Sequence, residues 1–149
     1  MPFEPRPRGR ARRREPNALQ LAKAAEIERL LAEGRERIGE LSDRDLLIAG
    51  AALYAGEGAK TNGKVSFANS DARMVSLFLI WLRTFFDPPE HRLRARVYLH
   101  QGLDLEAATR YWSDVTGIPA TQFHRPYRAQ ADASIRRSKH PMGLSLIHI

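Results

Sequence analysis

One carboxylate stands out in this 149-residue sequence because a glycine stands on each side of it. Glu57 follows Gly56 and precedes Gly58, at the end of a long uncharged stretch. The glycines permit a helix to end and the chain to turn sharply. A lone carboxylate at such a helix end suits a divalent metal ion, because Mg²⁺ prefers carboxylate oxygens. The alternative interpretation is a simple polar stop at the end of a helix.

The stretch before Glu57 predicts a capped helix. Ser42 is a favourable N-cap residue, and Asp45 stands where it would complete a capping box. Residues 46–55 carry no charge and are apolar or small on every side, as in a buried helix. Small residues four apart lie on one helix face and let another backbone approach closely. We therefore predict close helix packing through Gly50, Ala51, Ala52, Ala55 and Gly56.

Residues 50–58, GAALYAGEG, resemble the LAGLIDADG motif of homing endonucleases and their non-cleaving relatives. The likeness lies in the leading apolar residues, the small residue before the acid, and the glycine after it. Two positions depart from the motif: Ala52 replaces the usual Gly, and Ala55 replaces a common Asp. By order of elements, the resemblance covers roughly residues 41–127.

The resemblance implies an α+β fold, with helices packed on one face of a curved, mixed or antiparallel sheet that rests on DNA. In that family two motif helices pack together, and the last acid of each binds a divalent metal at the scissile phosphates. Carried over, Glu57 is the catalytic residue and the Mg²⁺ ligand. The chain holds one motif, so an active form would be a homodimer or pseudo-dimer. It also resembles WhiA-type actinobacterial regulators, which implies DNA binding without cleavage.

A second informative stretch is residues 91–100, which alternates like a half-buried strand. One side is apolar, while the other carries three Arg at two-residue spacing, which repel one another unless an anion arrives. A strand over residues 64–69 would extend this basic surface if both strands share one sheet. A solvated strand face is the alternative. The predicted nucleic-acid-binding residues are Lys60, Lys64, Ser66, Arg92, Arg94, Arg96, Tyr98 and His100, with Arg136, Arg137 and Lys139 from a basic loop.

Composition points to a polyanionic partner. The net charge is +7 and the pI is near 10.4, which favours nucleic acid. The absence of cysteine excludes a disulfide framework and a thiolate metal site. The five His lack metal-ligand spacing on a common helix face, and no glycine-rich phosphate loop follows a strand. We expect a cytoplasmic protein without membrane partners, since no apolar signal segment begins the chain.

The sequence predicts four consecutive parts. Residues 1–17 are rich in Arg and Pro and are expected to form a disordered basic arm. Residues 18–40 are expected to be a connecting helix, and residues 41–143 the LAGLIDADG-like domain. The final residues 144–149, LSLIHI, resemble translated sequencing-adapter sequence, so we expect a non-native tail and a domain that lacks its last strand and helix.

Three functions stay open on these observations. The favoured one is a double-stranded DNA-binding protein with an endonuclease-like fold, without catalysis and with a regulatory role. The second is an active Mg²⁺-dependent DNA endonuclease that works as a dimer. The third is a basic RNA-binding protein, which needs the arginine strand but not Glu57.

Overall fold

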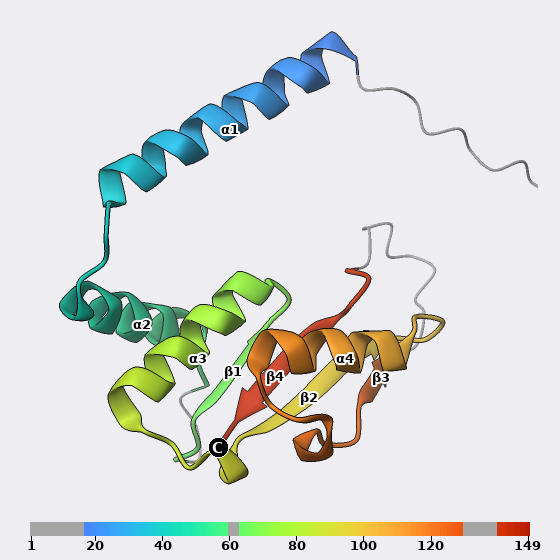
Figure 1. The fold of residues 1–149 in the computed structure, drawn as a ribbon. Helices are drawn as coiled ribbons and strands as arrows, with labels where there is room; N and C mark the ends of the chain where they lie inside the picture. The colour runs from blue at the N-terminus through green and yellow to red at the C-terminus, as the bar shows by residue number, and fades with distance from the viewer. Residues whose placement is uncertain (1–16, 60–62, 130–139) are drawn as a thin grey trace, which may run out of the picture. The chain divides into compact units, whose positions relative to one another are not determined.

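The computed structural model describes residues 17–59, 63–129 and 140–149, which divide into two units. The first unit ends at Leu41, and its described part is helix α1, Ala18–Ile38 (Figure 1). Asn17 caps this helix through a capping box with Gln20. The predicted helix over residues 18–40 is therefore present, while residues 1–16 of the predicted basic arm lie outside the described residues.

The second unit, Ser42 to Ile149, is an α+β fold, as predicted. Its strands form one mixed sheet in the order β1-β4-β2-β3, in which β4 is antiparallel to both neighbours and β3 is parallel to β2. None of the helices in the described residues is long and apolar enough to cross a membrane. The elements are α2 Asp43–Glu57, β1 Ser66–Asn69, α3 Ala72–Phe86, η1 Glu90–Arg92, β2 Arg94–His100, α4 Leu105–Thr116, η2 Ala120–Gln122, β3 Tyr127–Ala129 and β4 Leu144–His148.

Local capping signals explain where the helices begin and end. The predicted capping box of Ser42 and Asp45 opens α2. Asp71 and Asp104 cap α3 and α4 through side-chain bonds to backbone amides. Gly117, in the left-handed conformation, ends α4. These helix boundaries are therefore set by short-range sequence.

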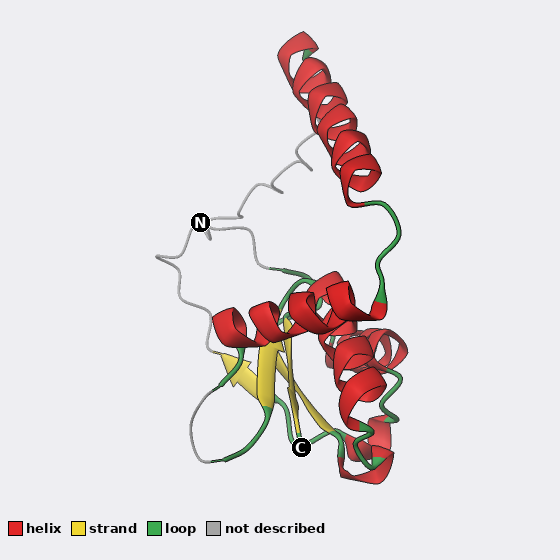
Figure 2. Ribbon diagram, turned by 90° about the vertical axis from the view of Figure 1, so that its left-hand side faces the viewer, coloured by secondary structure: helices red, strands yellow, loops and turns green. Residues whose placement is uncertain are grey.

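The core lies between the sheet and the helices of the second unit. Strand β2 buries every second residue, as its alternation predicts. Helices α3 and α4 lie over this face of the sheet, and Figure 2 shows the same helices to one side of the strands. Phe67 of β1 stacks on Phe78 of α3, with ring centroids 4.6 Å apart. The buried apolar residues include Phe67, Val75, Phe78, Leu79, Leu93, Ala95, Val97, Leu99, Ala108, Trp112, Ile118 and Ile147.

Helix α2 is not buried on every side, which corrects one prediction. Gly50 is its only buried residue, and it lies against the indole ring of Trp81 on α3. Gly50 therefore serves packing within the chain and is not available to a second subunit. Much of the rest of α2 is exposed, with Leu47 at 41% and Ile48 at 57% of their full accessible area. The other predicted packing residues, Ala51, Ala52, Ala55 and Gly56, are all exposed.

The C-terminal residues belong to the sheet, which corrects a second prediction. Residues 144–148 form β4 between β1 and β2, so the domain does not stop at residue 143. Ile147 is 1% exposed and Ser145 is completely buried. The expectation of a tail outside the domain failed because β4 pairs with strands far away in sequence, and such pairing leaves no local signal.

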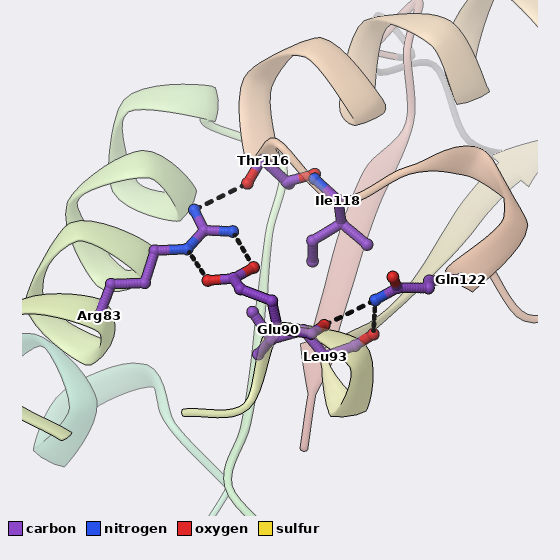
Figure 3. A network of polar contacts seen from close by, with 6 residues as sticks. All are labelled: Arg83, Glu90, Leu93, Thr116, Ile118 and Gln122. Atoms are coloured by element: carbon purple, nitrogen blue, oxygen red, sulfur yellow. Dashed lines mark hydrogen bonds and ion pairs between the residues drawn. The ribbon is translucent and has the colours of Figure 1, made fainter. Parts of the chain in front are cut away.

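A polar network joins the ends of α3 and α4 to the start of β2 (Figure 3). The Arg83 guanidinium donates two hydrogen bonds to the Glu90 carboxylate, at 2.7 and 3.0 Å, and a third to the Thr116 carbonyl at 2.9 Å. The bond from Arg83 holds the pKa of Glu90 below its usual value. The Gln122 amide donates to the carbonyls of Glu90 and Leu93, both at 2.8 Å. These bonds position the chain where it enters β2.

Substituting Gly50 by Ala should destabilise the protein by about 1–3 kcal/mol, the usual cost of overpacking. A Cβ at this position would lie 2.0 Å from Trp81 Cγ, so a packed ring must move. The matched control is Gly56→Ala, because no atom lies within 4 Å of the added Cβ there. That variant should be neutral or more stable by up to about 1 kcal/mol, since Ala favours a helix. Urea unfolding measures both changes, and equal stability of Gly50→Ala and wild type would contradict the packing.

Candidate nucleic-acid interface

The sheet face opposite the core aligns the predicted basic residues. Ser66 of β1 and Arg94 of β2 both pair with His148 of β4, which places the three in one row across the sheet. In the next row, Ala68 and Arg96 both pair with Leu146. The two strands therefore share one sheet, which was the condition for a common basic surface. They are not direct neighbours, however, because β4 lies between them.

Five basic side chains gather at one end of this face, and we call them the basic face: Lys64, Arg94, Arg96, His124 and His148. Strand β2 supplies both arginines, β4 supplies His148, and Lys64 precedes β1. His124 lies in the connection before β3, and its ring stacks on that of His148 with centroids 5.0 Å apart and planes 2° apart. None of the five forms an ion pair with an acid among the described residues.

The electrostatics of the basic face are visible at His148. Its pKa is lowered from the usual 6.5, first by burial and then by the positive charges of His124, Arg96, Lys64 and Arg94. Both causes disfavour the protonated ring. A negatively charged ligand on this face would act in the opposite direction and raise the pKa.

The two arginines of β2 differ in whether their side-chain N–H groups have hydrogen-bond acceptors within the protein. Arg94 donates from Nη1 to the carbonyls of His91 and Leu93, at 2.5 and 2.9 Å, which fixes its head beside the start of β2. The Nε atom of Arg96 is buried and has no hydrogen-bond partner among the described residues. A buried donor without an acceptor is costly and calls for a partner. Arg96 therefore has an unused donor in the middle of the face.

The other end of β2 is aromatic. Tyr98 and Tyr127, on the adjacent strands β2 and β3, form a tilted ring pair with centroids 5.3 Å apart. His100 follows on the same side of β2, and its Nδ1 atom is buried without a hydrogen-bond partner in the described part of the chain. The predicted residues Tyr98 and His100 therefore share a face with the arginines, as the alternation indicates.

Several predicted nucleic-acid-binding residues are not part of this face. Arg92 lies in η1, before the strand begins, so only two of the three arginines belong to β2. The strand starts two residues after Arg92 because Glu90–Arg92 form a short 3₁₀ turn. The remaining predicted residues lie outside the described residues: Lys60, Arg136, Arg137 and Lys139.

Glu57, the predicted catalytic metal ligand, is the last residue of α2 and is exposed. Its helix ends as predicted, and Gly58 and Phe67 form an antiparallel bridge that returns the chain toward β1. The described residues contain no group of three or more His, Asp or Glu side chains that could hold a metal ion. The role of Glu57 as a Mg²⁺ ligand therefore stays a prediction.

Three residues of this surface escaped the sequence reasoning. His124 and His148 lack ligand-type spacing, and only the sheet brings their rings together. Tyr127 lies in a three-residue strand, which is too short to show an alternation. No local signal in the sequence distinguishes these residues, because each depends on a contact between distant segments.

Comparison with protein-family models, with curated proteins and with solved structures finds no match for this chain. The resemblance to LAGLIDADG proteins accordingly stays a prediction from the residues of α2. Any function must be argued from the charges and contacts of the described surface.

The lowered pKa of His148 predicts that any polyanion bound on the basic face, with duplex DNA as the probe, binds more tightly as the pH falls from about 7.5 to about 5.5. Phosphate on the basic face would raise this pKa, so the complex takes up a proton that the free protein releases. Fluorescence anisotropy with a labelled duplex at constant ionic strength measures the change. His148→Gln should flatten the pH dependence, whereas His91→Gln, at an exposed position in η1, should leave it unchanged.

The stability of the free protein should depend on pH in the opposite direction to its affinity for DNA. The folded-state pKa of His148 is below its unfolded value, so its contribution to stability is present above pH 6.5 and is lost as the pH falls through the folded-state pKa. Thermal unfolding of the free protein should therefore show a Tm that decreases as the pH is lowered, over the same pH range in which DNA affinity increases. A DNA affinity that does not depend on pH would contradict the role of His148.

Proposed function

We propose that this protein binds double-stranded DNA through the basic face, without cutting it, and acts in regulation. The observation that carries the proposal is the set of cations without counter-charges: Lys64, Arg94 and Arg96 form no ion pair among the described residues. Cations held together on one face repel one another, and phosphates relieve that repulsion. The overall charge of +7 supports the same class of partner.

The form of the surface favours a nucleic-acid backbone over a small anion. Arg94 and Arg96 lie two residues apart on β2, or roughly 7 Å along the strand. The row through Ser66, His148 and Arg94 extends across three strands. Charges spread over this area suit a chain of phosphates better than one phosphate group. Such contacts position a protein on DNA without reading its sequence.

The lack of cleavage is proposed from the surroundings of Glu57. Metal-assisted phosphodiester hydrolysis needs a metal held by several ligands. Glu57 is a single exposed carboxylate, and the motif position that commonly holds Asp is Ala55. These features favour a DNA-binding module that has the motif helix without the chemistry.

The alternative is a Mg²⁺-dependent endonuclease that assembles as a homodimer. The supporting observation is the exposed side of α2, where Ala51, Ala52, Ala55 and Gly56 leave space for a second helix. Leu47 and Ile48 add exposed apolar area near the start of the same helix. Packing two copies of α2 would bring two Glu57 carboxylates toward one place. On this reading the dimer, and not the single chain, would provide the metal site.

The double variant Arg94→Ala/Arg96→Ala should weaken binding to every duplex and reduce the slope of log K against log salt by about two. The matched control is Arg73→Ala/Arg110→Ala, which removes the same charge from α3 and α4, where each arginine already pairs with a nearby acid. A salt titration of duplex binding by anisotropy measures both slopes. Equal losses in the two double variants would contradict the basic face as the binding site.

The same titration separates DNA from RNA. A structured RNA hairpin of equal length serves as competitor at fixed salt. Displacement of the duplex at much lower concentrations of RNA than of unlabelled DNA would favour the RNA-binding alternative. Comparable or weaker competition by RNA is the result that the proposal expects.

Plasmid nicking with Mg²⁺ or Mn²⁺ tests the catalytic alternative. We expect that wild type and Glu57→Gln both bind the plasmid and that neither nicks it. Asp114→Asn, at an exposed position on α4, is the control for loss of an acid elsewhere. Metal-dependent nicking by wild type and Asp114→Asn, lost in Glu57→Gln while binding persists, would instead identify a working endonuclease.

A further inference from the structure

A cavity of about 270 Å³ opens at the aromatic end of the sheet, and we call it the aromatic pocket. It lies where β2, β3 and the start of β4 meet. Strand residues and two flanking residues line it, among them Tyr98, Leu99, His100, Tyr127, His140 and Leu144. Most of this lining is apolar or aromatic, which distinguishes it from the basic face at the other end of β2.

The tyrosine pair gives the pocket an aromatic wall. Tyr98 and Tyr127 lie in register on neighbouring strands, and their ring planes are inclined by 39°. Tyr127 is 56% exposed, which is high for a large aromatic side chain. An exposed tyrosine ring that is supported by a second ring offers a rigid surface on which another planar ring can stack.

His100 adds a polar group to the same cavity. Its Nδ1 atom is buried, and no described residue gives it a hydrogen bond. His100 nevertheless lines the cavity, and an imidazole can accept or donate a hydrogen bond according to its protonation. The pocket thus combines a stacking ring with a hydrogen-bonding side chain in its lining, which suits a planar heterocycle.

The positive charge of Arg96 beside the pocket restricts the chemical class of the ligand further. Arg96, which forms no ion pair among the described residues, precedes Tyr98 by two residues on the same side of β2. A ligand that places a ring in the pocket would therefore hold an anionic group near Arg96. A planar base joined to a phosphate is a nucleotide. In a paired duplex the bases are stacked inside, so only an unpaired or extruded base reaches such a wall.

We propose that the aromatic pocket binds one unpaired base of a DNA strand whose phosphates lie on the basic face. This inference rests on the proposed function and specifies its substrate: DNA with an unpaired nucleotide beside a duplex. Tyr127, supported by Tyr98, stacks on the base, and His100 bonds to its edge. Arg96 contacts the adjoining phosphate.

Three labelled DNAs test the inference. They are a fully paired duplex, the same duplex with a single 2-aminopurine bulge, and the same duplex with an abasic nucleotide in the bulge. Wild type should bind the 2-aminopurine bulge at least about fivefold more tightly than the other two, given the usual gain from stacking one base. The 2-aminopurine fluorescence should fall on binding, because stacking on an aromatic ring quenches it.

Tyr127→Leu should lose the quenching and bind the bulged and the paired duplexes with equal affinity, because the stacking ring is gone. Tyr127→Phe retains the ring and should behave as wild type does. Both variants are expected to fold, because Tyr127 is largely exposed and lies in the edge strand β3.

The failures of the two proposals are distinguishable. Equal affinity of wild type for all three DNAs would overturn the pocket and leave duplex binding intact. Equal affinity for the 2-aminopurine and abasic bulges, both above the paired duplex, would assign the preference to backbone flexibility and also overturn it. A preference that survives in Tyr127→Leu would overturn the stacking role. Binding to none of the DNAs would overturn both proposals.

Discussion

The pairing of β4 between β1 and β2 is the interaction on which the second unit depends. Strand β1 pairs with β4 and not with β2, so β4 joins the two parts of the sheet. Two features position the residues just before β4. The Trp112 indole donates a hydrogen bond to the Met142 carbonyl at 2.8 Å, and Gly143 has a positive φ of 64°. A Cβ on Gly143 would lie 2.1 Å from the Tyr98 carbonyl oxygen, so this close approach requires glycine.

The same pairing creates the charged surface. His148 stands between Ser66 and Arg94 in one row, and its ring meets His124 from another segment. Repulsion among these groups opposes folding, while the buried inner side of β4, above all Ile147, favours it. A sheet can hold like charges on one face when the opposite face is anchored in a core. Burial of apolar side chains on the inner side of the sheet thus offsets the electrostatic repulsion within the basic face.

The two sides of helix α2 have different surroundings. Gly50 lets the helix approach Trp81, and Tyr54 stacks near Phe78, so one side belongs to the core. The other side combines small and apolar exposed residues with Glu57 at the end of the helix. Gly50 therefore packs against Trp81 within the chain, whereas the other small residues lie on the exposed side of the helix. One side of α2 therefore packs in the core of the second unit, and the other side is exposed.

Short-range sequence determined the helices, their caps and the alternation of β2, because capping boxes, glycine stops and two-residue periodicity act between near neighbours. It also identified Arg94, Arg96, Tyr98 and His100 as one face of a strand. Only the tertiary structure decided that β4 belongs in the sheet, that Gly50 faces Trp81, and that His124, His148 and Tyr127 join the surface. These features depend on contacts between segments far apart in the chain, and such contacts are selected by the packing of the whole unit rather than by any local pattern.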